Sequence, residues 1–186
     1  MHFLRRIIVP NWKPGRAAGA GLLATLVYSL AMEVDQRLIG NSFNDVRFIQ
    51  GLLGGKSRSK RLLLLAWLIH LFNGVALAEV YAALGKRFLP GPGWLKGAIF
   101  GEAFTIGVWS FTPLIDKYHP LIRSGEMPRL ANWTSFLQNL LRHLTFGLTL
   151  GLLYRDADAP GNPPLLKRAP LKARGEQTTE KAQANL

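Results

Sequence analysis

The sequence contains no cysteine and comparatively few charged residues. The absence of cysteine excludes disulfide bonds, thiolate nucleophiles, and zinc or iron–sulfur sites held by cysteine. Charged residues make up 18% of the chain, whereas a soluble domain carries about 25%. The charges that are present gather in short stretches between long apolar runs. This distribution is typical of a membrane protein.

The signatures of several enzyme classes are also missing from the sequence. It has no Gly-x-Ser-x-Gly nucleophile elbow, no His-Glu-x-x-His zinc motif and no phosphate-binding loop. It has none of the Glu-x-x-His pairs that hold iron in ferritin-like proteins either. We therefore expect a protein that is not an enzyme, with no catalytic residues and no metal site of these kinds.

Four apolar runs predict four transmembrane helices, at about residues 17–38, 62–84, 95–115 and 133–154. A helix needs about 20 residues to cross about 30 Å of hydrocarbon. The uncharged part of the first run ends at Met32, so that span must carry Glu33 toward one membrane surface. The start of the chain also has features of a cleaved signal peptide, with Ser29-Leu30-Ala31 after an apolar stretch. We favour a retained span because the basic segment before it is long and charged residues continue it.

These runs divide the chain into three parts. Residues 1–16 are a basic N-terminal segment, residues 17–155 are the predicted transmembrane domain, and residues 156–186 are a proline-containing polar tail that we expect to be disordered. The predicted fold class is therefore all-α, an integral membrane bundle of four helices with a disordered C-terminal tail.

The formal net charge of +12 has two interpretations. Basic patches can bind nucleic acid, but basic residues beside apolar spans are also what the positive-inside rule predicts. We favour the second interpretation and expect no nucleic-acid partner. The expected partners are the lipid bilayer, anionic lipid head groups at the basic loops, and a second copy or another membrane protein. More Lys and Arg residues flank the spans on the terminal side, which predicts cytoplasmic termini.

Polar side chains interrupt the predicted spans. An ionisable group at mid-bilayer costs about 2.5–3.5 kcal/mol, so it needs a partner, a wet cavity or a route to the surface. Counting residues from the helix ends predicts that Glu33 can meet His70 and that Glu79 can meet Glu102. Arg142 is then expected to pair with Glu33 or Glu102. The full predicted intramembrane polar network consists of Glu33, His70, Asn73, Glu79, Glu102, Asn139, Arg142 and His143.

This network allows several interpretations. Two carboxylates at one depth would share a proton, which suits a proton relay or a cation site. Polar side chains also join helices as structural contacts, which is the commoner use. His70 and His143 lie at comparable depth on spans that run in the same direction, and two such residues can hold haem b. We expect no cofactor and keep haem as the alternative.

Two Gly-x-x-x-Gly pairs occur in the later spans, Gly97/Gly101 and Gly147/Gly151. Small residues at this spacing let another helix approach closely. We favour packing within the bundle over a homodimer contact.

Small residues and single polar residues recur within the four apolar runs, in the stretches GLLATLVYSLAME, HLFNGVALAEVYAAL, WLKGAIFGEAF and HLTFGLTLGLLY. Over roughly residues 17–154 the chain resembles a family of bacterial four-span inner-membrane proteins that carry a domain of unknown function. The resemblance implies a multi-pass protein of the bacterial inner membrane and implies no activity. The polar residues within the spans favour a small transport or proton-handling component. The alternatives are a bis-His haem b electron carrier and a structural or assembly subunit.

Overall fold

The computed structural model describes residues 12–154, and all regular structure in this part of the chain is helical. The predicted disorder of residues 156–186 and most of the basic segment 1–16 lie outside the described residues. Helices cover each of the four apolar runs. The helices are α2 (Pro14–Ile39), α3 (Asp45–Gly54), α4 (Lys60–Val80), α5 (Lys86–Phe88), α6 (Gly93–Trp109), α7 (Thr112–Tyr118), α8 (Pro120–Arg123) and α9 (Trp133–Leu153), with a π-helical turn η1 (Tyr81–Gly85) between α4 and α5.

Local sequence signals explain where the helices start and stop. Pro14 opens α2, since proline at the first helical position loses no needed hydrogen bond. Gly40 ends α2 with φ 75°, a left-handed conformation that glycine adopts without strain. The side chain of Asn132 accepts a hydrogen bond from the backbone N–H of Ser135 at 2.9 Å. This contact makes Asn132 the N-terminal cap of α9.

Two helical segments are long and apolar enough to cross a membrane, Pro14–Ile39 and Lys60–Phe88. A third candidate arises if α6 and α7, which meet at a bend of 53°, are taken as one broken span. The helix α9 is not among these candidates. Its polar residues account for this, because it carries Gln138, Asn139, Arg142 and His143 within 21 residues. The all-α class is therefore confirmed, and two membrane-spanning candidates are established by length and composition.

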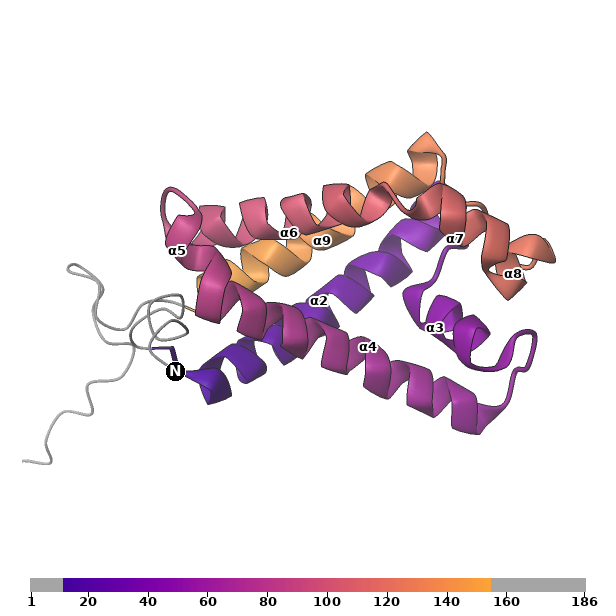
Figure 1. Cartoon of the computed structure of the whole chain (residues 1–186), viewed down its shortest axis with the longest axis horizontal. Coiled ribbons are helices and arrows are strands. Elements are labelled where there is room, and N and C mark those ends of the chain that lie inside the picture. The colour runs from indigo at the N-terminus through magenta and orange to yellow at the C-terminus, as the bar shows by residue number, and fades with distance from the viewer. Residues whose placement is uncertain (1–11, 155–186) are drawn as a thin grey trace, which may run out of the picture. The chain divides into compact units, whose positions relative to one another are not determined.

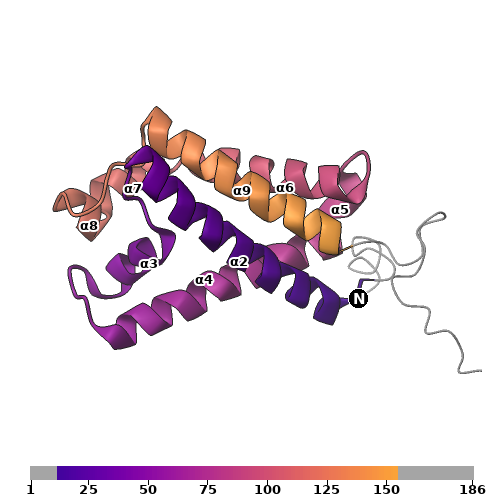
Figure 2. The same ribbon diagram turned by 180° about the vertical axis from the view of Figure 1, so that it is seen from behind.

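The long helices pack in the order α4, α2, α9, α6. In Figure 1, α2 lies between α4 and α9, and α6 covers the other side of α9; Figure 2 shows the same order from behind. The buried core of these helices is made largely of alanines and aromatic residues, among them Ala24, Tyr28, Ala78 and Phe146. Small residues let the helix axes approach closely, which is the usual mode of helix packing in lipid.

The outward faces of the long helices are apolar. Leu38 is 81% exposed on α2, Phe72 is 68% exposed on α4, and Leu137 is 57% exposed on α9. A protein that works in water rarely leaves so many large apolar side chains uncovered along its helices. These surfaces fit contact with lipid or with another protein.

A second core joins the segments that connect the long helices. Phe43, Leu121, Ile122 and Met127 bury one another there. His119 stacks on Phe48 with ring centroids 4.2 Å apart, and its Nε2 donates to the Phe48 carbonyl at 3.0 Å. Burial lowers the pKa of His119, and the hydrogen bond to the Phe48 carbonyl offsets part of this effect. The connection before α4 and the connection before α9 thus form one packed unit.

Candidate functional site

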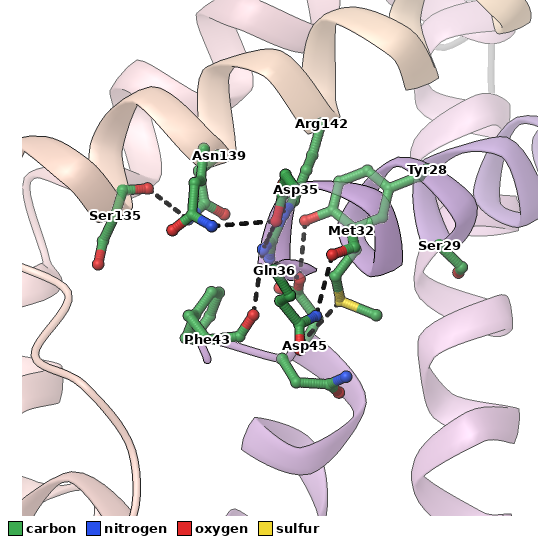
Figure 3. A network of polar contacts seen from close by, with 12 residues as sticks. Tyr28, Ser29, Met32, Asp35, Gln36, Phe43, Asp45, Ser135, Asn139 and Arg142 are labelled. Carbon is green, nitrogen blue, oxygen red and sulfur yellow. Dashed lines mark hydrogen bonds and ion pairs between the residues drawn. The ribbon is translucent and has the colours of Figure 1, made fainter. Parts of the chain in front are cut away.

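Arg142 is the centre of a buried charge cluster. Its side chain is 0% exposed. Its Nε donates to Oδ2 of Asp35 at 2.5 Å and its Nη2 donates to Oδ1 of Asp35 at 2.6 Å. Its Nη1 donates to Oδ2 of Asp45 at 3.2 Å, and Nη2 also donates to the Phe43 carbonyl at 3.1 Å. Figure 3 shows Arg142 reaching from α9 toward both carboxylates. The guanidinium therefore forms a bidentate ion pair with Asp35 and a single hydrogen bond with Asp45.

Residues of α2 form the wall of this cluster. Tyr28, Met32 and Asp35 follow one another at helical spacing and are all buried. The Tyr28 hydroxyl donates to Oδ2 of Asp45 at 3.0 Å. The sulfur of Met32 accepts the backbone N–H of Asp45 at 3.3 Å. The short connection after α2 folds back on that helix, and this turn delivers Asp45 to the cluster.

The predicted partners of Arg142 were wrong. Neither Glu33 nor Glu102 contacts it; the partners are Asp35 and Asp45. Glu33 is two residues from Asp35, and two residues turn a helix by about 200°, so the two carboxylates face opposite sides. Glu33 points outward and pairs with Arg37 at 2.6 Å.

The signal that would have identified Asp35 is the repeat of buried positions along α2. Ala17, Ala24 and Tyr28 already mark one stripe of small or buried residues. Extending this stripe at the helical period reaches Asp35 rather than Glu33. Asp45 carried no comparable signal, because its position depends on the path of a connection between helices.

His70 and His143 both contact the ring of Tyr28. The Tyr28 ring centroid is 5.7 Å from that of His70 and 5.0 Å from that of His143. His70 Nε2 lies 3.0 Å from the Ser29 hydroxyl, whose own hydrogen goes to the Thr25 carbonyl. His70 therefore donates through Nε2. The predicted contact between His70 and Glu33 is replaced by this bond to Ser29.

The second imidazole, of His143, is held by its own helix. Its Nδ1 donates to the carbonyl of Asn139 at 3.0 Å. The side chain of Asn139 in turn donates to the Ser135 carbonyl at 2.8 Å. Asn139 and His143 are thus both bonded within α9, unlike Arg142 on the same helix. This arrangement leaves Nε2 of His143 as the ring's acceptor atom.

The two acidic residues predicted to share a proton have different surroundings. Glu79 Oε2 accepts a hydrogen bond from Trp12 Nε1 at 2.8 Å. Glu102 has a buried Oε1 without a hydrogen-bond partner in the described part of the chain. No hydrogen bond joins the two carboxylates within residues 12–154. Their predicted pairing stays a prediction.

A cavity of about 480 Å³ lies beside the charge cluster. Its walls come from α2, α3, α4, α6 and α9. The lining is largely apolar, and four of its aromatic residues are Tyr28, Phe48, Phe104 and Phe146. The other polar members of the lining are Thr25, Asp45, His70, Asn73 and His143. Several residues of the predicted polar network therefore do meet, but around a cavity rather than in direct pairs.

The two Gly-x-x-x-Gly pairs meet each other. A side chain on Gly97 would come within 2.1 Å of the Gly147 carbonyl, and one on Gly151 would come within 2.2 Å of the Gly93 carbonyl. The predicted packing of these glycines inside the bundle is confirmed. The contact fixes α6 against α9 and so positions Phe104 and His143 on the cavity wall.

Within residues 12–154 no group of three or more His, Asp and Glu side chains is placed to hold a metal ion. The haem alternative, which needs only two histidines, stays a prediction.

Comparison with known proteins leaves the activity open. No curated protein matches the chain significantly, and neither does any solved structure. A protein-family profile matches residues 13–162, which include every helix described above. The chain belongs to the family described as "Family of unknown function (DUF6789)".

Proposed function

We propose that the protein is a multi-pass membrane protein that binds a small molecule in the cavity between its helices, as a non-enzymatic transport component. The cavity is the observation that carries this proposal. Its volume of about 480 Å³ falls within the roughly 300–1,000 Å³ typical of small-molecule sites. It also combines apolar walls with a few polar groups, which is the usual composition of such sites.

Four crossings of the bilayer are part of the proposal. Two helices qualify by length and composition, and the bent pair α6 and α7 offers a third crossing. For α9 the support is the direction of its polar residues. Gln138 and Arg142 are buried inside the protein, whereas Leu137 and Leu141 are 57% and 48% exposed. Polar groups that face a bundle interior are tolerated within a membrane, so the composition of α9 does not prevent it from spanning.

Bound small molecules provide the direct test. The protein would be purified in mild detergent and examined by native mass spectrometry for retained adducts. We expect Ala76→Trp, which places a large ring in the cavity lining, to abolish these adducts. Ala103→Trp is the matched control, since Ala103 is exposed on α6 and is not part of the lining. Adducts that survive Ala76→Trp unchanged would refute a ligand in this cavity.

Proton handling is the second candidate function. It is supported by a run of groups that can exchange protons along one wall: Tyr28 donates to Asp45, and its ring contacts His70 and His143. Reconstituted protein would then conduct protons into liposomes that contain a pH-sensitive dye. We expect Tyr28→Phe to lower that flux, because it removes the hydroxyl but keeps the ring. A flux that is unaffected by Tyr28→Phe would count against this route.

Haem binding is less favoured by the geometry. Nε2 of His70 is bonded to the Ser29 hydroxyl rather than free to ligate iron, and the Tyr28 ring contacts both imidazoles. The purified protein is therefore expected to show no Soret absorption. A Soret band that is lost in His70→Ala would overturn this expectation.

A further inference from the structure

The charge cluster has one more carboxylate than it has cations. Arg142 engages Asp35 through two hydrogen bonds, and that pair is neutral overall. Asp45 receives one bond from the same guanidinium and one from the Tyr28 hydroxyl. The start of α3 offsets part of the Asp45 charge, because a helix N-terminus carries roughly half a positive charge. Among residues 12–154, no Lys or Arg lines the cavity to neutralise the remaining negative charge.

The Asp45 carboxylate is available to a ligand. Both of its side-chain hydrogen bonds, from Tyr28 and Arg142, end on Oδ2. Among residues 12–154, no hydrogen-bond donor reaches Oδ1. The side chain is 22% exposed and forms part of the cavity lining. An excess carboxylate in apolar surroundings favours the entry of a positive charge, because pairing lowers its desolvation cost.

The cavity walls favour a particular kind of cation. The aromatic residues Tyr28, Phe48, Phe104 and Phe146 line it, and aromatic faces attract organic cations. A metal ion is poorly suited, since calcium takes six to eight oxygen ligands and the cavity offers one carboxylate. We infer that the cavity takes a lipophilic organic cation, such as a substituted ammonium or phosphonium, with its charge directed at Asp45. This inference rests on the proposed small-molecule function.

Two probes of matched shape and opposite charge test the inference. Tetraphenylphosphonium and tetraphenylborate would be titrated into the detergent-solubilised full chain by calorimetry. We expect the phosphonium to bind and Asp45→Asn to weaken it about tenfold, in line with the loss of one desolvated charge contact. The borate is expected to bind more weakly than the phosphonium. Glu33→Gln is the matched control, since it removes an exposed carboxylate outside the cavity and should leave binding unchanged.

A second variant guards against misfolding of Asp45→Asn. Phe104→Ala removes one aromatic wall and touches none of the bonds to Arg142. Phe104→Ala should lower phosphonium affinity severalfold. The thermal stability of Asp45→Asn is measured separately to show that this variant folds. Loss of affinity in both variants supports the inference. Unchanged phosphonium binding in a folded Asp45→Asn protein would overturn it.

The remaining outcomes separate this inference from the proposed function. Equal binding of both probes, abolished by Ala76→Trp, would retain the cavity as a binding site and overturn the preference for cations. If no phosphonium binds but neutral adducts are lost in Ala76→Trp, the cavity is likewise retained as a binding site and the preference for cations is overturned. Absence of phosphonium binding together with a proton flux that Asp45→Asn abolishes would assign the excess charge to protons. Absence of every probe and every adduct would overturn both proposals.

Discussion

The helix α9 has two faces that contact the rest of the protein by different means. Toward α2 and α3 it presents Arg142, which is held by hydrogen bonds and charge. Toward α6 it presents Gly147 and Gly151, whose backbones lie directly against those of Gly97 and Gly93. The charged face depends on a few strong and directional bonds, whereas the glycine face depends on the absence of side chains. The two faces should therefore respond differently to substitution.

The largest effect is expected from the charged face. Arg142→Met leaves the buried Asp35 and the partly exposed Asp45 without a cation. Breaking a buried ion pair typically costs about 3–5 kcal/mol. The free energy of unfolding, measured by titration with a denaturing detergent, should fall by about this amount. Arg37→Met is the control, because that arginine is 75% exposed. Equal stability of the two variants would show that the cluster does not hold α9 in place.

The glycine face should show a smaller but still clear effect. Gly97→Ala places a methyl group within 2.1 Å of the Gly147 carbonyl, so the helices must separate. Overpacking of this kind costs about 1–3 kcal/mol. Gly107→Ala on the same helix is the control, since nothing lies within 4 Å of the added carbon. Unfolding measurements that rank Gly107→Ala as the more damaging change would contradict close contact between α6 and α9.

A third effect concerns the packed connections before α4 and before α9, which belong to neither the charged face nor the glycine face of α9. Burial lowers the pKa of His119 in the folded protein, whereas the unfolded chain keeps a value near 6.5. Below about pH 6.5 the unfolded state therefore binds more protons, so the free energy of unfolding falls as the pH falls. Its Nδ1 is buried without a partner among the described residues, so a proton there gains no hydrogen bond. We expect a loss smaller than that of Gly97→Ala.

The measurement is the unfolding midpoint at pH 7 and at pH 5. His119→Asn should weaken the pH dependence while the ion pair between Arg142 and Asp35 stays intact. An unchanged pH dependence in His119→Asn would assign the titration to another group.

The smallest effect is expected from the exposed ion pair of α2. Glu33 and Arg37 are 51% and 75% exposed, and exposed pairs one helical turn apart contribute about 0.3–0.5 kcal/mol. Glu33→Gln should therefore change the free energy of unfolding by no more than about 0.5 kcal/mol. A larger loss would mean that lipid, rather than water, surrounds this pair.

The sequence anticipated the close contact of glycines better than the contact of charges. The Gly97/Gly101 and Gly147/Gly151 spacing is a local pattern, and both pairs were expected at a helix contact. The partner of Arg142 was predicted from depth alone, which gave Glu33 or Glu102. Depth fixes the position of a residue along a helix axis but does not fix the side of the helix on which it lies. Asp35 was missed for that reason, whereas the position of Asp45 depends on the path of the connection after α2.

The sequence by itself determined that the protein is all-α, and two of the four membrane spans that it predicted qualify by length and composition. It could do so because hydropathy and helical period are properties of neighbouring residues. Only the tertiary structure decided which carboxylates surround Arg142, and that Asp45 borders a cavity with one oxygen free of hydrogen bonds within the described part of the chain. These facts depend on the rotation of each helix and on the return path of the chain after α2, which packing of the whole bundle sets.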